Sequence, residues 1–369
     1  QSLSATAILP SVNAGVFRMA QVDEGKLMEF VGRMLGDIGG AVSTPLVRIG
    51  DALGLYKALD AGGPCTADDL ADAADCDRRY VREWLSAQAA SGYVTYDAAT
   101  GRFSLSPEQA LVFATPDSPV NLIGAFDTAA AMLDNQAKVQ AAFKTGKGVA
   151  WGDQAGCLFC AVARLFRPGY VNALVQDWLP ALTGVVDRLK AGATVADVGC
   201  GHGLSTVLMA QAFPKSQFTG YDFHPGSIAA ATAHARAHGV TNVRFEVGRA
   251  QDFSARDLDF VTCFDCLHDM GDPAAAAAHI RSVLKPGGTW MVVEPRAGDS
   301  LADNLNPVGR IYYAASTMIC VPTSLAQETK TALGAQAGEK RIAEVIRSGG
   351  FAQVRRAAET PLNMVLEAT

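Results

Sequence analysis

The sequence predicts an α/β protein in two parts: a mainly helical N-terminal part, and a larger doubly wound parallel sheet whose last strand is antiparallel. Two observations predict the sheet. Apolar strand patterns alternate with helical patterns from about residue 194 to residue 294, and a glycine-rich turn follows the first strand. Crossover helices make such a sheet parallel and place its ligand at the carboxyl ends of the strands. A third observation, the order helix, helix, helix, hairpin in residues 44–105, predicts a winged helix in the first part.

Length, composition and charge exclude several classes of protein. The 369 residues leave room for about two domains with cores of their own. A net charge of −6 argues against a nucleic-acid or anionic-membrane partner, because both need a basic face. No apolar run reaches roughly 18 residues, and no basic segment followed by a hydrophobic one opens the chain. We therefore predict a cytoplasmic protein without membrane contact, and interpret residues 1–20 as a tag or a disordered extension.

Residues 21–118 are predicted to form the winged-helix part. Apolar side chains at helical spacing predict a helix over residues 22–40, ended by Gly39 and Gly40, and a second helix over about 44–59. Each helix carries an apolar face that needs a partner. That partner is either another subunit or the rest of the domain.

Helix-start residues and a hairpin complete this pattern. Thr66, Asp77 and Ser106 each stand before a helical pattern and are predicted N-caps. Residues 93–96 and 103–105 have the composition of two hairpin strands.

The helix after Asp77 would be the recognition helix of a DNA-binding winged helix. It carries Arg78, Arg79 and Arg82, which suits DNA. Glu83 and many other acids surround these arginines, and the chain is acidic overall. DNA binding is therefore the disfavoured alternative, and we predict no nucleic-acid partner.

Residues 119–182 are predicted to be a helical linker that forms a lid and a substrate wall. The helical pattern is broken by the glycine-rich run 145–153, in which Trp151 offers a ring to bury. A lid and a plain linker anchored by Trp151 both fit this run. Arg167 and Tyr170 follow just ahead of the sheet, where either side chain could reach a bound ligand or pack on the surface.

The central motif is the turn after the strand predicted at residues 194–198, with glycines at Gly199, Gly201 and Gly203. Glycine tolerates positive φ and lets a ligand approach the backbone. The helix behind the turn offers free N–H groups. A carboxylate at Asp197 would repel a phosphate, yet it could accept hydrogen bonds from an amino group, directly or through water. The glycine spacing also differs from that of P-loops and dinucleotide-binding turns.

A second acid supports a nucleoside ligand. Asp222 ends the strand predicted at residues 216–221, where a ribose diol would lie. Two acids around three glycines predict an adenosyl site, with S-adenosylmethionine as the cofactor. Further strands are predicted at residues 242–247, 258–264 and 289–294, with a closing hairpin at 351–354 and 363–366.

These residues resemble the class I S-adenosylmethionine-dependent methyltransferases. Asp197 and the three glycines match the first motif of that family, and Asp222 matches its ribose-binding acid. The resemblance implies a Rossmann-like fold over residues 183–369, with a cap insertion at about 300–335 and S-adenosylhomocysteine as the product.

The adenine contact departs from the family pattern. The family usually has Gly-Asp-Ala-x-Asp here, and this chain reads Gly248-Arg249-Ala250-Gln251-Asp252. Arg249 stands where an adenine-binding acid is common, so backbone groups at Ala250 and the amide of Gln251 are the predicted contacts. The resemblance also places Phe264, at the end of the fourth strand, beside the cofactor.

Methyl transfer from a sulfonium requires an aligned nucleophile and often a base. The run Leu267-His268-Asp269-Met270 resembles the Leu/Cys-His-Asp-Trp segment of O-methyltransferases, in which the histidine is the general base. Met270 replaces the tryptophan that touches adenine in that family. A buried structural histidine is the alternative to a base at His268. Glu294, which ends the fifth strand, could orient the imidazole.

The acceptor is predicted from aromatic side chains, and the partner from a second resemblance. Trp151, Tyr170, Tyr312 and Tyr313 are the predicted substrate-binding residues, and their rings suit a small aromatic or hydrophobic acceptor, with O-methylation favoured. The cap that carries the last two could equally be a dimer contact. Residues 21–118 are similar to the N-terminal dimerisation domain of small-molecule O-methyltransferases, which implies a homodimer.

The cysteines predict no metal site. Cys157 with Cys160, and Cys263 with Cys266, have Cys-x-x-Cys spacing, but a structural zinc site needs four converging ligands. We interpret these side chains as reduced core thiols. Two alternatives to a methyltransferase stay open: the same fold using the sulfonium cofactor without methyl transfer, and a regulator in which the winged helix reads DNA and the second part senses the cofactor.

Overall fold

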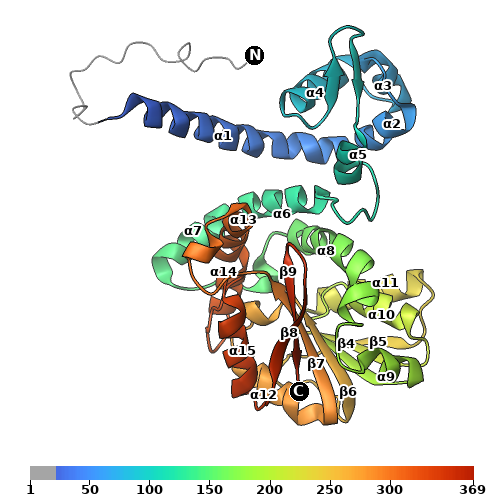
Figure 1. The fold of residues 1–369 in the computed structure, drawn as a ribbon, viewed down its shortest axis with the longest axis vertical. Helices are drawn as coiled ribbons and strands as arrows, with labels where there is room; N and C mark the ends of the chain where they lie inside the picture. The colour runs from blue at the N-terminus through green and yellow to red at the C-terminus, as the bar shows by residue number, and fades with distance from the viewer. Residues whose placement is uncertain (1–21) are drawn as a thin grey trace. The chain divides into compact units, whose positions relative to one another are not determined.

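The computed structural model describes residues 22–369, and the chain divides into two compact units between Thr115 and Pro116 (Figure 1). The interpretation of residues 1–20 lies outside the described residues. The first unit contains helices α1 (Glu24–Ala52), α2 (Leu55–Gly62), α3 (Ala67–Ala73), α4 (Arg78–Ala90) and α5 (Pro107–Phe113), and strands β1 (Thr95–Asp97) and β2 (Arg102–Ser104).

The predicted break at Gly39 and Gly40 is wrong, because α1 runs through both glycines. A glycine inside a helix costs about 1 kcal/mol relative to alanine, but it keeps its N–H and does not interrupt the hydrogen bonds. The chain turns instead at Gly54, which adopts the left-handed conformation with φ of 70°. Much of the apolar face of α1 is exposed in the single chain; its exposed members are Leu27, Phe30, Leu35, Ile38, Val42 and Ile49.

The predicted caps and hairpin of the first unit are confirmed. Thr66 and Ser106 each form a capping box, and Asp77 accepts hydrogen bonds from two backbone N–H groups of α4. Strands β1 and β2 pair antiparallel. The core is aromatic: the ring of Tyr56 stacks on that of Phe113 with 4.9 Å between the ring centroids.

The second unit is built on a seven-stranded sheet in the order β5-β4-β3-β6-β7-β9-β8. Strands β3 to β7 are parallel, and β9 and β8 are antiparallel to their neighbours, which confirms the predicted fold class. The strands are β3 (Thr194–Val198), β4 (Gln217–Asp222), β5 (Val243–Val247), β6 (Leu258–Phe264), β7 (Leu284–Pro295), β8 (Val354–Glu359) and β9 (Asn363–Ala368).

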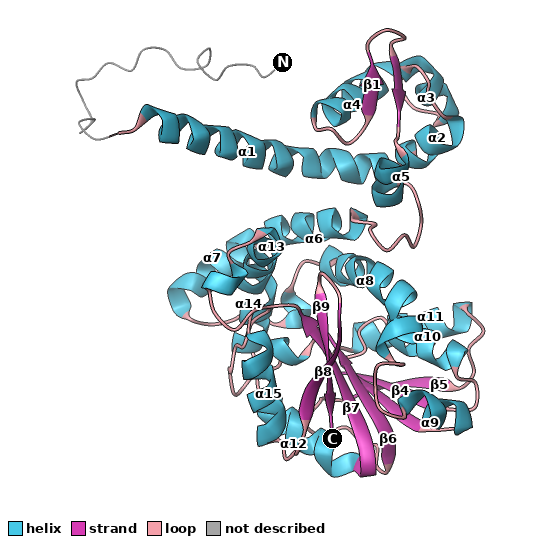
Figure 2. Ribbon diagram, viewed as in Figure 1, coloured by secondary structure: helices cyan, strands magenta, loops and turns pink. Residues whose placement is uncertain are grey.

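Helices cover both faces of this sheet. Figure 2 shows α9 (Val185–Ala191), α10 (Leu204–Ala212) and α11 (Pro225–Ala237) on one side, and α12 (Pro273–Val283) and α15 (Gly338–Ser348) on the other. Side chains of β7 alternate between the two cores, because neighbouring residues of a strand point to opposite faces. Trp290 and Val292 pack in the core under α12 and α15, whereas Met291 and Val293 pack in the opposite core.

The closing hairpin differs from the prediction in one strand. The strand predicted at residues 351–354 begins only at Val354, and Phe351 is instead buried against Trp290 with 5.2 Å between ring centroids. The apolar side chain fills the core from the loop after α15. Strand β9 is inserted between β7 and β8, so that the last strand of the chain is internal to the sheet.

The remaining helices stand at the carboxyl edge of the sheet. Ahead of β3 they are α6 (Ile123–Asp134), α7 (Gln136–Thr145), the short turn η2 (Trp151–Asp153), α8 (Cys157–Gly169) and its π-helical continuation η3 (Tyr170–Trp178). The short turn η4 (Leu267–Asp269) follows β6, and η5 (Ala302–Asn304), α13 (Pro307–Ala315), η6 (Ser316–Cys320) and α14 (Val321–Leu325) follow β7.

One stretch among residues 22–369, Cys157–Trp178, is long and apolar enough to cross a membrane by length and composition. It is not an uninterrupted apolar run, because Arg164, Arg167 and Asp177 lie within it, and the sequence therefore predicts no membrane span here. In the structure this stretch is α8 with η3, which packs on α6 and α10 and buries Leu158, Leu174 and Trp178. A core helix passes the same test, so the absence of membrane contact and the cytoplasmic location stay predictions.

Candidate functional site

A cavity of about 590 Å³ opens at the carboxyl ends of β3, β4 and β6, within the second unit. Its volume lies in the usual range for small-molecule sites. The predicted site residues that line it are Trp151, Tyr170, Gly199, Gly201, Asp222, Ala250, Gln251, Phe264, His268 and Tyr312. Four others do not line it: Asp197, Gly203, Glu294 and Tyr313. The structure therefore brings most of the predicted cofactor and acceptor residues into one cavity.

The glycine turn joins β3 to α10 at one end of the cavity. Gly199, Gly201 and Gly203 all have positive φ, between 51° and 75°. A Cβ on Gly199 would lie 2.6 Å from the sulfur of Cys266, and one on Gly203 would lie 2.7 Å from the ring of Phe245. A Cβ on Gly201 would meet nothing within 4 Å, so Gly201 leaves open space toward the cavity. The outer glycines allow tight packing, and the middle one leaves room for a ligand.

Asp197 lies beneath the turn and not in the cavity wall. Its buried carboxylate accepts hydrogen bonds from the hydroxyls of Ser205 at 2.8 Å, Thr206 at 2.6 Å and Thr262 at 2.9 Å. Burial raises the pKa of this carboxyl, and the three hydroxyl donors oppose that shift. The structure thus ties Asp197 to the start of α10 and to β6. Asp197 therefore supports the turn, and its hydrogen bond to the amino group of a ligand, directly or through water, stays a prediction.

Asp222 does line the cavity. Its carboxylate accepts hydrogen bonds from the N–H of Gly201 at 3.0 Å and from the N–H of His224 at 2.8 Å. Burial raises the pKa of this carboxyl, and the two backbone donors oppose the shift. Each oxygen receives one donor, which leaves lone pairs for the hydroxyls of a ligand. The acid therefore connects the glycine turn to the end of β4.

The segment after β5 forms the next part of this wall. Ala250 and Gln251 line the cavity as predicted. Arg249 turns its guanidinium to Asp252 at 2.5 Å, in an exposed ion pair. It does not replace the missing acid, and the adenine contact remains a prediction for Ala250 and Gln251.

The other end of the cavity carries a buried imidazole. Nδ1 of His268 lies 2.5 Å from Oε2 of Glu294, whose Oε1 accepts the N–H of Leu267 at 2.9 Å. Burial disfavours the imidazolium, but the charges of Glu294 and Asp269 outweigh it and raise the pKa of His268 well above its usual value. The structure thus brings the two predicted catalytic residues into contact, with Glu294 behind His268.

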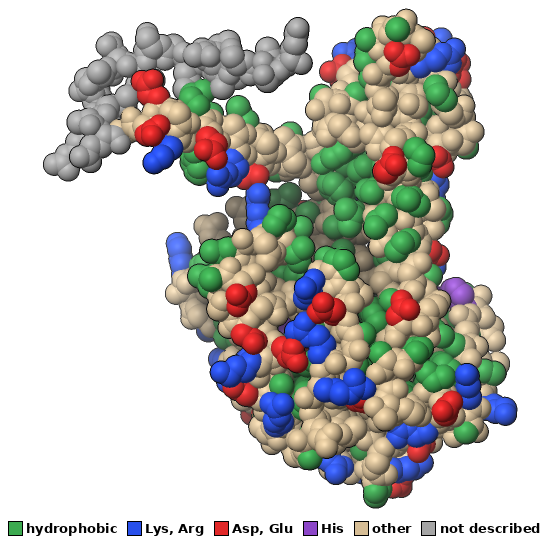
Figure 3. All heavy atoms as spheres, viewed as in Figure 1, with side chains coloured by type: hydrophobic (Ala, Val, Ile, Leu, Met, Phe, Trp, Pro, Cys, Tyr) green, Lys and Arg blue, Asp and Glu red, His purple; other side chains and the backbone are tan. Residues whose placement is uncertain are grey.

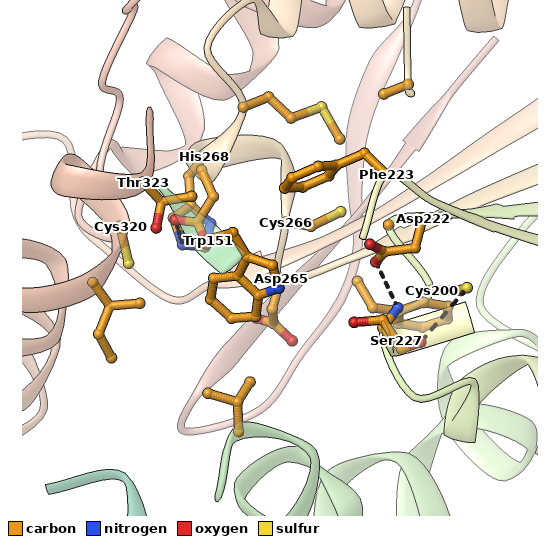
Figure 4. Close-up of a pocket in the computed structure, with 18 of the residues that line it drawn as sticks. Trp151, Cys200, Asp222, Phe223, Ser227, Asp265, Cys266, His268, Cys320 and Thr323 are labelled. Carbon is orange, nitrogen blue, oxygen red and sulfur yellow. Dashed lines mark hydrogen bonds and ion pairs between the residues drawn. The ribbon is translucent and has the colours of Figure 1, made fainter. Parts of the chain in front are cut away.

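Figure 4 shows how these residues are distributed. His268, Cys320 and Thr323 lie toward one end of the view, and Asp222, Cys200 and Ser227 lie toward the other. Asp265 and Cys266 lie between the two groups, immediately after β6. We call the first group the imidazole end of the cavity and the second, where a nucleoside is predicted to bind, the nucleoside end.

The predicted acceptor residues come from three segments. Trp151, on η2, packs edge-on against Phe159 with 5.2 Å between ring centroids. The hydroxyl of Tyr170 donates to Oδ2 of Asp265 at 3.1 Å, and that of Tyr312 donates to the carbonyl of Leu362 at 2.8 Å. Tyr313 neighbours Tyr312 on α13 but does not reach the cavity wall.

Contacts of Arg167 and of the glycine-rich run 145–153 bear on what was predicted for residues 119–182. Arg167 does not reach the cavity, because it pairs with Asp117 through two hydrogen bonds of 2.5 and 2.9 Å. The glycine-rich run before Trp151 is held on α14: the N–H of Val149 donates to the carbonyl of Pro322 at 2.9 Å. A Cβ on Gly148 would lie 2.0 Å from that same carbonyl oxygen, so the backbone packs very closely here.

The described residues contain one group of potential metal ligands, which the sequence analysis missed. Ligand atoms of His268, Asp269 and Cys320 lie within 4.8 Å of one another. Nε2 of His268 is 3.1 Å from Oδ1 of Asp269, so these two groups already face each other. Burial raises the pKa of the Cys320 thiol to about 12, which keeps it protonated. Neither Cys-x-x-Cys pair belongs to this group.

Sequence reasoning also missed Asp265. From the residues that follow β6, the sequence predicts a role for His268 alone. In the structure the carboxyl of Asp265 also lines the cavity, between its two ends. Its backbone has φ of 50°, a conformation that side chains other than glycine rarely adopt. No local pattern in the sequence announces that conformation.

Comparisons with known proteins give the class of the chain. Residues 189–349 match the family model described as a methyltransferase domain, and residues 41–115 match the Rv2258c-like winged HTH domain. The chain therefore carries a methyltransferase domain preceded by a winged-helix domain. The resemblance drawn from the glycine turn and the winged-helix pattern is confirmed at the level of both domains.

Curated relatives match a shorter part of the chain than the methyltransferase family model does. The chain is 34% identical over 130 residues to the ubiquinone biosynthesis O-methyltransferase of Leptothrix cholodnii, covering 34% of this chain and 52% of that protein. It is 39% identical over 108 residues to the enzyme of the same name from Xanthomonas euvesicatoria, covering 28% of this chain and 44% of that protein. The chain thus spans about half the length of the curated relatives it matches.

Solved structures share the fold over nearly the whole chain. A protein from Nostoc punctiforme described as a putative O-methyltransferase superposes with a TM-score of 0.68 at 17% identity, covering 91% of this chain and 98% of that one. Human N-acetylserotonin methyltransferase, solved in complex with SAM, superposes with a TM-score of 0.63 at 14% identity, covering 95% and 99%. At these identities the likeness shows the fold alone.

Proposed function

We propose that this protein is an S-adenosylmethionine-dependent methyltransferase that acts on a small aromatic or hydrophobic acceptor, with oxygen as the favoured methylated atom. One observation carries the proposal: a single cavity is lined by the glycine turn and Asp222 at one end and by His268, which Glu294 supports from behind, at the other. The first end suits an adenosyl group, and the second suits the removal of a proton. The names of the curated relatives and of the structural neighbours agree with this chemistry.

The nucleoside end fits S-adenosylmethionine on three points. Gly201 leaves open space toward the cavity, Asp222 keeps lone pairs for a ribose diol, and Ala250 and Gln251 line the same cavity as proposed adenine contacts. Phe264, at the end of β6, also lines the cavity and is a proposed cofactor contact. The cofactor supplies an activated methyl group, and the protein has to align the acceptor and manage its proton.

His268 is the proposed general base. Its imidazole accepts the proton of the acceptor hydroxyl, and Glu294 stabilises the imidazolium that results. Because the charges of Glu294 and Asp269 raise the pKa of His268, the basic form of the imidazole accumulates as the pH rises. Rings of Trp151, Tyr170 and Tyr312 supply the aromatic wall for the acceptor.

A homodimer is proposed through the first unit. The exposed apolar side chains of α1 form the kind of surface that marks a protein interface. Light scattering on the wild type and on Ile38→Glu tests this, since a charge on that face is expected to shift a dimer toward monomer. A wild type that is monomeric at micromolar concentration would contradict the proposal.

The regulator alternative is disfavoured by the arginines of the winged helix. Arg78 pairs with Asp72, Arg79 with Glu83, and Arg82 with Asp68. Phosphate contacts need free cations, and these three are engaged with acids. Acidic and basic side chains are also interspersed over the face of the second unit seen in Figure 3. Salt-dependent binding to duplex DNA would favour the regulator instead.

Calorimetric titration with S-adenosylmethionine and S-adenosylhomocysteine tests the cofactor first. Mass spectrometry of a panel of phenols incubated with protein and cofactor then tests the reaction, with a gain of one methyl group as the expected result. Cofactor binding without any methylated product from a broad panel would favour the alternative in which the sulfonium serves another reaction. If the wild type binds neither S-adenosylmethionine nor S-adenosylhomocysteine, both the methyltransferase proposal and this alternative are contradicted.

A further inference from the structure

The carboxyl of Asp265 occupies a central place that the proposed mechanism does not use. It lies in the turn after β6, between Phe264 and Cys266, and its side chain lines the cavity. Figure 4 shows it between Asp222 on one side and His268 on the other. Any ligand that spans the cavity from the nucleoside end to the imidazole end passes this carboxyl.

The backbone at Asp265 is held in a sparsely populated conformation. Its φ is 50°, and no other non-glycine residue described in the cavity wall has positive φ. Aspartate tolerates this conformation better than most residues with a Cβ, but it remains uncommon. It persists here because the N–H of Asp265 donates to the carbonyl of Val293 at 2.8 Å and so fixes the turn to β7. Such outliers gather where the fold holds a functional side chain in place.

Two neutral donors aim the carboxylate. The hydroxyl of Tyr170, from η3, donates to Oδ2 at 3.1 Å, and the amide of Asn363, from β9, donates to Oδ1 at 2.7 Å. Three segments far apart in the chain therefore converge on one carboxyl group. Each oxygen keeps lone pairs, so a ligand can still bind it.

Among residues 22–369, no described lysine or arginine ion pair involves Asp265. The positive charge that acts on this carboxyl is that of His268, which already faces the two acids Glu294 and Asp269. Burial and the charge of Glu294 raise the pKa of Asp265 to about 8, although His268 opposes the shift. A buried carboxyl in this state binds a cation readily, because the cation restores the charge balance that the fold leaves open.

The cavity as a whole favours positive charge. Its wall carries the acids Asp222, Asp265, Asp269, Asp272 and Glu328. Against these acids stand Arg249, which pairs with Asp252, and His268, which faces Glu294 and Asp269; the described wall contains no lysine. Clefts lined by one sign of charge concentrate ligands of the opposite sign.

We propose that Asp265 is the counter-ion for a positively charged group, an ammonium or a sulfonium, that a ligand brings into the cavity. This proposal rests on the proposed function, because both sources of such a group are reactants of methyl transfer. The cofactor carries a sulfonium and an ammonium, and an acceptor with an amine carries an ammonium. Binding of either group displaces the proton of Asp265 to solvent and leaves a carboxylate beside the cation.

The test uses Asp265→Asn in the full-length protein. Asparagine is the side chain, apart from glycine, that best tolerates the left-handed backbone, and it can still accept from Tyr170. Glu328→Gln is the matched control, because it removes one negative charge from the cavity rim without touching Asp265. Unchanged thermal unfolding of both variants shows that each remains folded.

The probes separate the sources of the cation. Calorimetry measures the dissociation constants of S-adenosylmethionine, S-adenosylhomocysteine and 5′-methylthioadenosine, of which the second lacks the sulfonium and the third also lacks the amino acid. With S-adenosylhomocysteine bound, the same method compares tyramine, which carries an ammonium, with the neutral 4-ethylphenol. Titration in buffers of different ionisation enthalpy reports the proton released on binding.

We expect Asp265→Asn to raise the dissociation constant of one cationic ligand by roughly ten- to a hundred-fold and to abolish the proton release on binding. Glu328→Gln should change the same dissociation constant less than about threefold. If S-adenosylmethionine loses more affinity than S-adenosylhomocysteine, the partner of Asp265 is the sulfonium. If these two lose affinity equally and 5′-methylthioadenosine is unaffected, the partner is the ammonium of the cofactor. If tyramine alone loses affinity, the partner is the ammonium of the acceptor.

Two results would overturn the proposal: all dissociation constants unchanged in Asp265→Asn, or equal weakening of the charged and the neutral probes. Failure of the wild type to bind either adenosyl amino acid is a separate outcome. It would contradict the proposed function itself, whereas intact cofactor binding with no effect of Asp265→Asn contradicts only the counter-ion.

Discussion

The two ends of the cavity are built in different ways. The nucleoside end comes from three successive strand ends: the turn between β3 and α10, Asp222 at the end of β4, and Ala250 with Gln251 after β5. Its acids are satisfied by neutral donors: hydroxyls for Asp197 and backbone N–H groups for Asp222. The imidazole end draws on η3, β7, η6 and the turn after β6, and the charged group that its acids share is the imidazole of His268.

The difference separates binding from chemistry. Backbone groups of a tight turn can hold a nucleoside but cannot move a proton at neutral pH. Side chains gathered from distant segments can have their pKa values shifted by burial and by one another. Substitutions at the nucleoside end should therefore change cofactor affinity, and those at the imidazole end should change turnover.

The largest expected effect is on turnover in His268→Ala. Loss of a general base lowers kcat by roughly 10²- to 10⁴-fold. The dissociation constant of S-adenosylhomocysteine should stay within about twofold, since His268 lies away from the nucleoside end. Steady-state kinetics and calorimetry measure the two quantities.

His268→Asn is the companion variant. It keeps a donor for the buried Glu294, so a loss of kcat shared by both variants reflects proton transfer and not an unpaired carboxylate. Retained turnover on a true substrate would mean that alignment alone drives the reaction.

The opposite pattern is expected for Asp222→Ala. Removing this carboxylate should weaken the binding of S-adenosylmethionine by roughly ten- to a hundred-fold, because the ribose diol loses its charged hydrogen-bond acceptor. Turnover at saturating cofactor should fall much less. Asp252→Ala serves as the control, because its exposed ion pair with Arg249 lies outside the cavity contacts proposed for ribose. Unchanged affinity in Asp222→Ala would move the ribose site elsewhere.

A smaller effect is expected in the pH profile. The wild-type kcat should rise with pH above neutrality, because the pKa of His268 is raised and the base works only when deprotonated. Glu294→Gln removes the negative charge that most raises this pKa, so the rising limb should move to lower pH by about one unit or more. Kinetics across pH 5.5–9.5 measures the limb. A limb that does not move would assign the titration to another group.

The smallest effect is expected from a chelator. Nδ1 of His268 is held by Glu294, and burial raises the pKa of the Cys320 thiol to about 12, so two of the three groups are poorly prepared to bind a metal. Incubation with EDTA followed by dialysis should leave the melting temperature and the affinity for S-adenosylhomocysteine unchanged. A fall in either, reversed by zinc, would show that the three side chains hold a metal.

The accuracy of the sequence predictions follows the same division. The glycine turn, Asp222, the five parallel strands and the caps at Thr66, Asp77 and Ser106 were all readable from the sequence, because each depends on residues within a few positions. The error at Gly39 and Gly40 has a local cause: two glycines weaken a helix without breaking it, and only the left-handed Gly54 turns the chain.

The sequence by itself determined the class of the fold and the nucleoside end of the cavity, because spacing along one chain encodes a strand, a turn and a helix. Only the tertiary structure decided that Glu294 stands behind His268, that Arg167 is taken by Asp117, and that Tyr170 and Asn363 aim Asp265 into the cavity. These contacts join residues up to 98 positions apart. Their side chains meet because the sheet order places β6 beside β7 and β9 next to it, and a linear pattern does not carry that order.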